Sequence, residues 1–172
     1  MSPCAEASKA ERMRLTVALL VAVSLIAAGG CSSAGNVAVP TSCTGATNDK
    51  IAALIARRYD GEVDNVMVCG TTFASSRPQR SGPHGGHQLL PLRIPLPDGS
   101  SALVEVVTND NLDGIVTAPR GAHVAAYGQY YLTTDSQRPF VAGIHDTHCA
   151  THRGADNGWI VVNAAKFPAR GC

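Results

Sequence analysis

The sequence predicts a mainly β protein, a small antiparallel barrel of five or six strands with one N-terminal α-helix. One stretch, residues 47–61, has apolar side chains at helical spacing. From residue 63 onward, short apolar runs alternate with turns rich in Gly, Pro, Asn and Asp, which is typical of strands with tight connections. The sequence contains no internal repeat, so residues 47–172 are expected to form a single helix-plus-barrel domain.

The first 30 residues have the features of an export signal. Met13 and Arg14 open a basic segment, and an uninterrupted apolar run follows at 15–28. This run is shorter than the roughly 20 apolar residues that a membrane-spanning helix needs, and small residues follow it. Residues 1–30 are therefore predicted to be a signal peptide, with Met1 or Met13 as the true start.

The end of the apolar run resembles a bacterial lipobox. It reads "AAGGC" and is followed by a Ser/Gly-rich stretch. This pattern predicts lipidation at Cys31, a lipidated tether over 31–46, and attachment to the membrane of the cell envelope through that anchor. The alternative is ordinary signal cleavage nearby, which would give a soluble secreted protein.

The charge balance argues against a nucleic-acid partner. The chain has 14 basic and 13 acidic residues, and removal of 1–30 takes away three of the former and two of the latter, which leaves 11 of each. A domain that neutralises phosphates normally has a strong basic excess. No nucleic acid is expected as a partner, and the sequence does not identify a protein partner.

The cysteines indicate disulfides. Once Cys4 is removed with the leader and Cys31 is lipidated, four remain: Cys43, Cys69, Cys149 and Cys172. An even number of cysteines in an exported chain favours disulfides over free thiols. Three pairings are possible, and we favour Cys43–Cys69 with Cys149–Cys172 because each would join the ends of one local unit. The alternative is that Cys149 is a metal ligand.

The helix is expected within "TNDKIAALIARRYDG". Thr47 or Asn48 is a suitable N-cap, and Gly61 suits the C-terminal turn. Four apolar side chains share one face of this helix: Ile51, Leu54, Ile55 and Tyr59. So short a helix needs support from neighbouring elements, which a Cys43–Cys69 bridge would supply.

The strands are expected in the order in which apolar runs occur. They cover 65–73, 89–96, 102–108, 123–132, 140–147 and 159–167, and a Gly/Pro/Ser/Arg loop occupies 75–87. In 89–96 the side chains of Leu90, Leu92, Ile94 and Leu96 alternate onto one face. Because Pro91 and Pro95 cannot donate to a ladder, this strand is expected at an edge or to be irregular.

Residues 84–167 resemble the domain-of-unknown-function 3465 family, a group of small exported bacterial domains. Three motifs carry the resemblance: His87-Gln88, Gly143-Ile144-His145 with Thr147-His148, and Gly158-Trp159-Ile160 with Asn163 and Lys166. Thr108, Asp146, Cys149, Ala150 and Ala155 depart from the family pattern, so a family site that needs those positions would be incomplete in this chain. The resemblance implies an OB-like barrel and an envelope location, and no activity.

The histidines are the main candidates for chemistry. We consider a site for Zn²⁺ or Cu²⁺ that draws on His84, His87, His145, Asp146, His148 and His152. In a continuous strand, His145 and His148 would point to opposite faces, so only a turn after Asp146 would bring them together. The alternative is that the histidines are architectural and hydrogen-bond the backbone at the mouth of the barrel.

These observations leave three functional hypotheses. The leading one is a cell-envelope binding module with a histidine-lined site for a transition metal or a small ligand. The second is a structural or interaction domain of the envelope. The third is a metal-dependent hydrolase, although the sequence contains no nucleophile elbow and no Gly-rich phosphate loop, and no catalytic residue is assigned. The turn "NDNLDG" lacks the bidentate Glu of a calcium loop and is interpreted as a turn.

Overall fold

The computed structural model describes residues 37–82 and 85–172. The predicted signal peptide, the lipidation site Cys31 and the candidate ligand His84 lie outside the described residues. Within the described ranges, no helix combines the length and the apolar character that a bilayer crossing requires.

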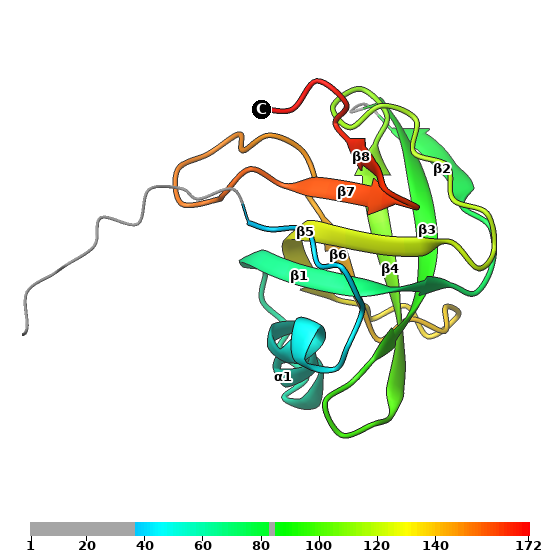
Figure 1. Cartoon of the computed structure of the whole chain (residues 1–172), viewed down its shortest axis with the longest axis vertical. Helices are drawn as coiled ribbons and strands as arrows, with labels where there is room; N and C mark the ends of the chain where they lie inside the picture. Colours follow the sequence, from blue (N-terminus) through cyan, green and yellow to red (C-terminus); the bar gives the residue numbers. More distant parts are fainter. Residues whose placement is uncertain (1–36, 83–84) are drawn as a thin grey trace, which may run out of the picture. The chain divides into compact units, whose positions relative to one another are not determined.

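The protein is mainly β, as predicted (Figure 1). Its elements are a 3₁₀ turn η1 (Ala46–Asn48), a helix α1 (Asp49–Ala56), and strands β1 (Val63–Thr72), β2 (Arg77–Gly82), β3 (Gly85–Pro95), β4 (Ser101–Asn109), β5 (His123–Leu132), β6 (Ala142–His145), β7 (Trp159–Val162) and β8 (Ala165–Phe167). The strand count therefore exceeds the five or six expected, because residues 75–87 and 159–167 each contribute more strand than their sequences indicate.

Five of the strands close into a barrel. The order is β1-β3-β4-β6-β5, and β5 pairs with β1 to complete the ring. All neighbours are antiparallel except β4 and β6, which run parallel with Val106 opposite Ile144. The expectation of a wholly antiparallel barrel is wrong at this pair, because β6 folds back antiparallel onto β5 and so lies between β5 and β4, where it runs parallel to β4. The closed order agrees with an OB-like barrel.

The barrel interior holds the main apolar core. Leu90, Leu92 and Ile94 of β3 are fully buried there, which confirms the alternation seen in the sequence. Ile51 and Leu54 of α1 join the same core. Figure 1 shows α1 beside the start of β1 and the turn between β3 and β4.

A second apolar cluster lies on the outer face of β1, β5 and β7. Its buried members are Cys69, Ala125, Tyr127, Trp159 and Val161. Val37 and Cys43, from the segment before η1, pack against it. Part of the predicted tether is therefore joined to the barrel wall.

The predicted caps of the helix are wrong. Asn48 makes no side-chain cap, and Thr47 bonds to Thr44 instead. The Asn48 amide is fully buried and bonds to the backbone N–H and C=O of Cys69 on β1. These two buried bonds use the side chain that would otherwise cap the helix. The helix ends at Ala56, and Arg58, with φ 47°, takes the left-handed position that was expected near Gly61.

The strand with the prolines is not an edge strand. β3 pairs with β4 along its whole length and with β2 and β1 on its other side. Pro91 and Pro95 bracket the pairing with β1, which involves only Leu92 and Arg93 of β3. Because Pro91 and Pro95 have no N–H to donate, the pairing of β3 with β1 is restricted to two residues that lie between them.

Both predicted disulfides are present, Cys43–Cys69 and Cys149–Cys172. The second removes Cys149 as a metal ligand in the oxidised protein.

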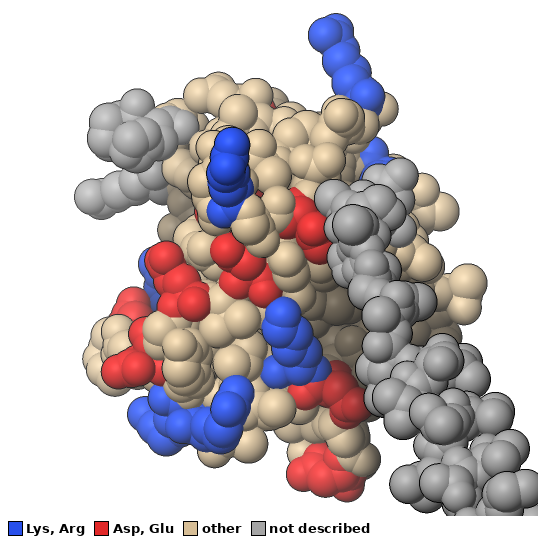
Figure 2. Space-filling view, turned by 90° about the vertical axis from the view of Figure 1, so that its left-hand side faces the viewer, with Lys and Arg blue, Asp and Glu red and all other residues tan. Residues whose placement is uncertain are grey.

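On the face of the molecule in Figure 2, Lys and Arg side chains are interspersed with Asp and Glu among the described residues.

Candidate functional site

Two histidines flank one aspartate where β6 ends. Asp146 Oδ1 lies 3.4 Å from His145 Nδ1 and 3.6 Å from His148 Nε2. β6 stops at His145, and Asp146 adopts φ 51°, in the left-handed region. The turn that the sequence analysis required is therefore present, and it places the two imidazoles on two sides of the same carboxylate.

Two glycines allow this turn to pack against the barrel. A Cβ at Gly128 of β5 would lie 2.2 Å from the carbonyl oxygen of His145, and a Cβ at Gly158 would lie 2.5 Å from that of Asp146. The amide of Gly158 also donates to the carbonyl of His148 at 2.8 Å. Close backbone approach thus fixes the position of Asp146, and only glycine permits it.

The proton on His148 is located by its backbone contact. Nδ1 lies 3.0 Å from the carbonyl oxygen of Cys149, and a carbonyl can only accept, so Nδ1 carries the proton. In the neutral ring, Nε2 then presents a lone pair to Asp146 Oδ1, which is also an acceptor. Two acceptors that face each other at 3.6 Å are favourable only with a cation between them, either a proton or a metal ion.

A small cavity opens beside this pair. Its lining includes the acidic side chains Asp64, Asp146 and Asp156 with the imidazoles of His148 and His152, and contains no Lys or Arg. The volume is about 20 Å³, which is room for one water molecule or one metal ion and too little for an organic ligand. His152 Nδ1 lies 3.2 Å from the carbonyl of Arg153, so its Nε2 is also a free lone pair in the neutral ring.

The loop 146–158 is held over the barrel by polar contacts with β1 and β5. The side chain of Asn65 accepts from the amide of Asp156 at 2.8 Å, and Tyr127 Oη donates to Asp156 Oδ2 at 3.0 Å. Burial, together with this bond to a carboxylate, raises the pKa of Tyr127 to about 12. The Cys149–Cys172 bridge ties the loop to the C-terminus.

A buried carboxylate, that of Asp113, bonds to the turn that follows β6. Asp113 is 3 % exposed, accepts from the amide of Asn109 at 2.7 Å, and accepts from Thr147 Oγ1 at 3.3 Å. Burial raises the pKa of Asp113, although the bond from Asn109 and the proximity of His148 act in the opposite direction. The "NDNLDG" turn therefore holds Thr147, next to His148.

His145 faces away from the cavity. Its ring meets the Tyr131 ring edge-on with 5.2 Å between centroids, and its Nε2 lies 4.0 Å from Glu62 Oε1. This Nε2 is shielded from solvent and has no hydrogen-bond partner. Asp146 therefore belongs to two pairs, one with His145 and one with His148.

The structure brings together only part of the predicted ligand set. Asp146, His148 and His152 share the cavity and His145 contacts Asp146, whereas His87 pairs in the sheet with Gln79 and Asn109. Within the described ranges, His87 does not line the cavity and no hydrogen bond or ion pair links it to the turn after β6, so its part in the site stays a prediction. Glu62, Asp64 and Asp113 were not predicted, because they are remote in sequence and reach the site only through the fold of the barrel. Asp156 was not predicted either, because no local pattern in the loop 146–158 shows that it turns back onto β1.

One further group has ligand-like geometry. Among the described residues, the only three metal-ligating side chains whose ligand atoms all lie within 4.8 Å of one another are Cys43, Cys69 and His123. The two sulfurs are bonded to each other, so this group does not offer thiolates in the oxidised protein.

No family model, curated protein or solved structure matches this chain. The resemblance to the domain-of-unknown-function 3465 family therefore stays a prediction. The site itself is the basis for any statement about function.

Proposed function

We propose that this protein is a metal-binding module of the cell envelope and that its ion is bound at Asp146 and His148. The observation that carries the proposal is the pair of facing acceptors, Asp146 Oδ1 and His148 Nε2, 3.6 Å apart at the edge of a cavity of ion size. Imidazole and carboxylate together are typical ligands of Zn²⁺ and Cu²⁺.

The surroundings of the pair favour a cation. Asp64 and Asp156 line the same cavity, and the nearby Lys50 ammonium donates to the backbone carbonyls of Asp64 and Asn65 rather than to a carboxylate. No Lys or Arg side chain in the cavity lining therefore neutralises the carboxylates of Asp64, Asp146 and Asp156. An ion of charge +2 would be attracted to this point more strongly than an anionic or neutral ligand.

A further ligand would come from an exposed histidine, His152. His152 lines the cavity, and His145 already contacts Asp146 from the opposite side. The exposed ring of His152 can rotate toward an ion held by the central pair, whereas His145 packs on Tyr131 and would support the ion through Asp146. The backbone contacts of His148 and His152 leave Nε2 as the ligand atom in both rings, an arrangement that is common around protein-bound metals.

An exported location is consistent with this proposal. Two disulfides in a chain of this size favour an oxidising compartment. A lipid on Cys31 would keep the module at the membrane surface. A structural domain with architectural histidines is the competing proposal, and the same experiment decides between the two.

The test is a titration of the oxidised full chain with Zn²⁺ or Cu²⁺, alongside Asp146→Asn and His148→Gln. We expect one ion per chain, with affinity at least about tenfold weaker in each variant and also weaker at acid pH, since a protonated imidazole cannot be a ligand. His87→Gln, which changes a histidine that does not line the cavity, should bind like the parent. Absence of binding, or equal binding by His148→Gln, would favour architectural histidines.

A further inference from the structure

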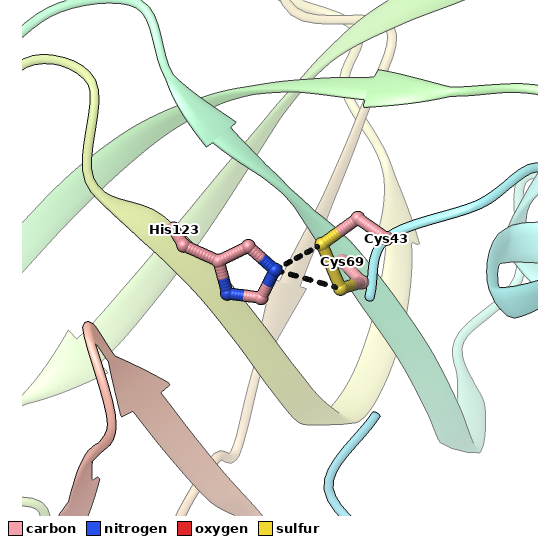
Figure 3. Close-up of side chains that lie close together, drawn as sticks. All are labelled: Cys43, Cys69 and His123. Carbon is pink, nitrogen blue, oxygen red and sulfur yellow. Dashed lines mark hydrogen bonds between the residues drawn. A yellow bond between two sulfur atoms is a disulfide. The ribbon is translucent and has the colours of Figure 1, made fainter. Parts of the chain in front are cut away.

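The Cys43–Cys69 disulfide has an imidazole directly beside it. His123 Nε2 lies 3.1 Å from Cys43 Sγ and 4.0 Å from Cys69 Sγ (Figure 3). The three residues come from the segment before η1, from the middle of β1 and from the start of β5. This group lies outside the cavity at Asp146, and the proposed function does not use it.

Cys69 and His123 are held in place independently of the bond between the sulfurs, and the segment that carries Cys43 is anchored at the next residue. Cys69 is paired with Ala125 of β5, and its backbone N–H and C=O both bond to the Asn48 side chain. The backbone of His123 exchanges two hydrogen bonds of 2.9 Å with Asn163. Next to Cys43, the carbonyl of Thr44 accepts from Asn48 at 3.3 Å. Breaking the disulfide therefore leaves the three side chains close together.

The spacing suits a metal ion once the sulfurs are free. Zn–S bonds of about 2.3 Å and Zn–N bonds of about 2.0 Å in a tetrahedral site place neighbouring ligand atoms roughly 3.5 Å apart. The two nitrogen–sulfur distances lie on either side of that value. Only the two sulfurs have to separate, and Cys43 lies on an irregular segment that can supply this movement.

We propose that reduction converts this disulfide into a binding site for a thiophilic metal ion such as Zn²⁺, with Cys43, Cys69 and His123 as ligands. A dithiol reductant delivers two electrons and two protons to the disulfide and is itself oxidised to a disulfide, which leaves two thiols on the protein. Binding of Zn²⁺ to both sulfurs and to Nε2 then releases the two thiol protons. Two thiolates and one imidazole are a known ligand set for Zn²⁺, with a fourth position for water. This second metal site would thus form only under reducing conditions.

The test uses the full chain with Cys4, Cys31, Cys149 and Cys172 changed to Ser, so that Cys43 and Cys69 are the only cysteines. Bound Zn²⁺ is measured by competition with a chromophoric chelator, before and after reduction with a phosphine. We expect reduction to add one Zn²⁺ per chain. His123→Gln should weaken this added site by at least about tenfold. His148→Gln should leave it unchanged, which separates it from the proposed site at Asp146.

If reduction unfolds the barrel, circular dichroism measures whether Zn²⁺ refolds it. Zn²⁺ should then restore the β signal of the reduced parent chain at a concentration that does not restore it in His123→Gln. No added Zn²⁺ on reduction, or an added site that His123→Gln retains in full, would overturn the proposal. Neither result would bear on the proposed site at Asp146, because that site is tested by titration of the oxidised chain.

Discussion

Asn48 acts as a pairing partner for the backbone of Cys69. Its Oδ1 accepts from the Cys69 amide at 2.8 Å, and its Nδ2 donates to the Cys69 carbonyl at 2.9 Å. The same Nδ2 lies 3.0 Å from the carbonyl of Pro95 on β3. Asn48 is fully buried, so these bonds replace the water that would otherwise solvate the middle of β1. One side chain thereby joins the start of the helix to two strands of the barrel.

Replacing Asn48 should therefore destabilise the whole domain. Asn48→Ala leaves a buried N–H and a buried C=O of Cys69 without partners, and we expect a loss of about 3 kcal/mol in the free energy of unfolding. Asn48→Asp should cost at least as much, because a carboxylate oxygen would then face the carbonyls of Cys69 and Pro95. Urea denaturation measures both values.

The matched control for Asn48 is Gln137→Ala, on an exposed turn. It should change the free energy of unfolding by less than about 0.5 kcal/mol. If Asn48→Ala is as mild as this control, the amide does not have the role described above.

Gly128 should be essential for the turn at Asp146. In Gly128→Ala, the new methyl group would lie 2.2 Å from the carbonyl oxygen of His145, which is backbone and cannot rotate away. We expect a loss of about 3 kcal/mol in stability and a loss of metal binding at Asp146. Thermal denaturation and a Zn²⁺ titration measure the two effects.

Gly61→Ala is the control for the glycine prediction. Its added Cβ would meet only the exposed side chain of Tyr59, which can move. Metal binding in this variant should equal that of the parent. A Gly128→Ala protein with normal metal binding would contradict the placement of the site.

Tyr127 should make stability depend on alkaline pH. Its pKa is raised from 10.0 to about 12 in the folded protein, so the fold favours the neutral phenol. The resulting stabilisation is complete below pH 10 and is lost as the pH rises from 10 to 12. Tyr127→Phe should make the decline in unfolding free energy over this range shallower.

Absorbance of tyrosinate provides a direct readout for Tyr127. The amplitude of the transition near pH 12 should fall in Tyr127→Phe and stay unchanged in Tyr59→Phe, a change at an exposed tyrosine. Burial also raises the pKa of Tyr130 and Tyr131, so some high-pH absorbance change remains. If Tyr127→Phe keeps the full amplitude near pH 12, Tyr127 is not the tyrosine that ionises there.

The ionised carboxylate of Asp113 should lower the free energy of unfolding, because this side chain is buried. Because burial raises its pKa above 3.8 in the folded protein, protonation stabilises the fold, and this contribution is lost as the pH rises through the folded pKa. Asp113→Asn keeps an oxygen for the Asn109 amide and carries no charge. We expect it to be more stable than the parent at pH 7, with the advantage shrinking toward pH 4. Denaturant titrations at several pH values measure the difference, and a variant less stable than the parent at pH 7 would contradict it.

Much of the barrel was predictable because its strands are encoded locally. Leu90, Leu92 and Ile94 alternate in sequence, and they line one face in the structure because successive side chains of a strand point to opposite sides. The sequence favoured the observed cysteine pairing, since each bridge closes a short segment, but left the other two pairings open. The parallel pairing of β4 with β6 was not, because no local pattern records which strand closes a barrel.

The sequence by itself determined the mainly β class, the helix position, the four cysteines available for disulfides and the cluster at 145–152 that contains the candidate site. Only the tertiary structure decided that Asp146 lies between His145 and His148 and that Asp64 and Asp156 line the cavity beside Asp146 and His148. It also placed His123 beside the Cys43–Cys69 bridge. The physical reason is the same in each case. Backbone periodicity is set by neighbours along the chain, whereas the contacts of a site depend on strand register and on the close approach that Gly128 and Gly158 allow.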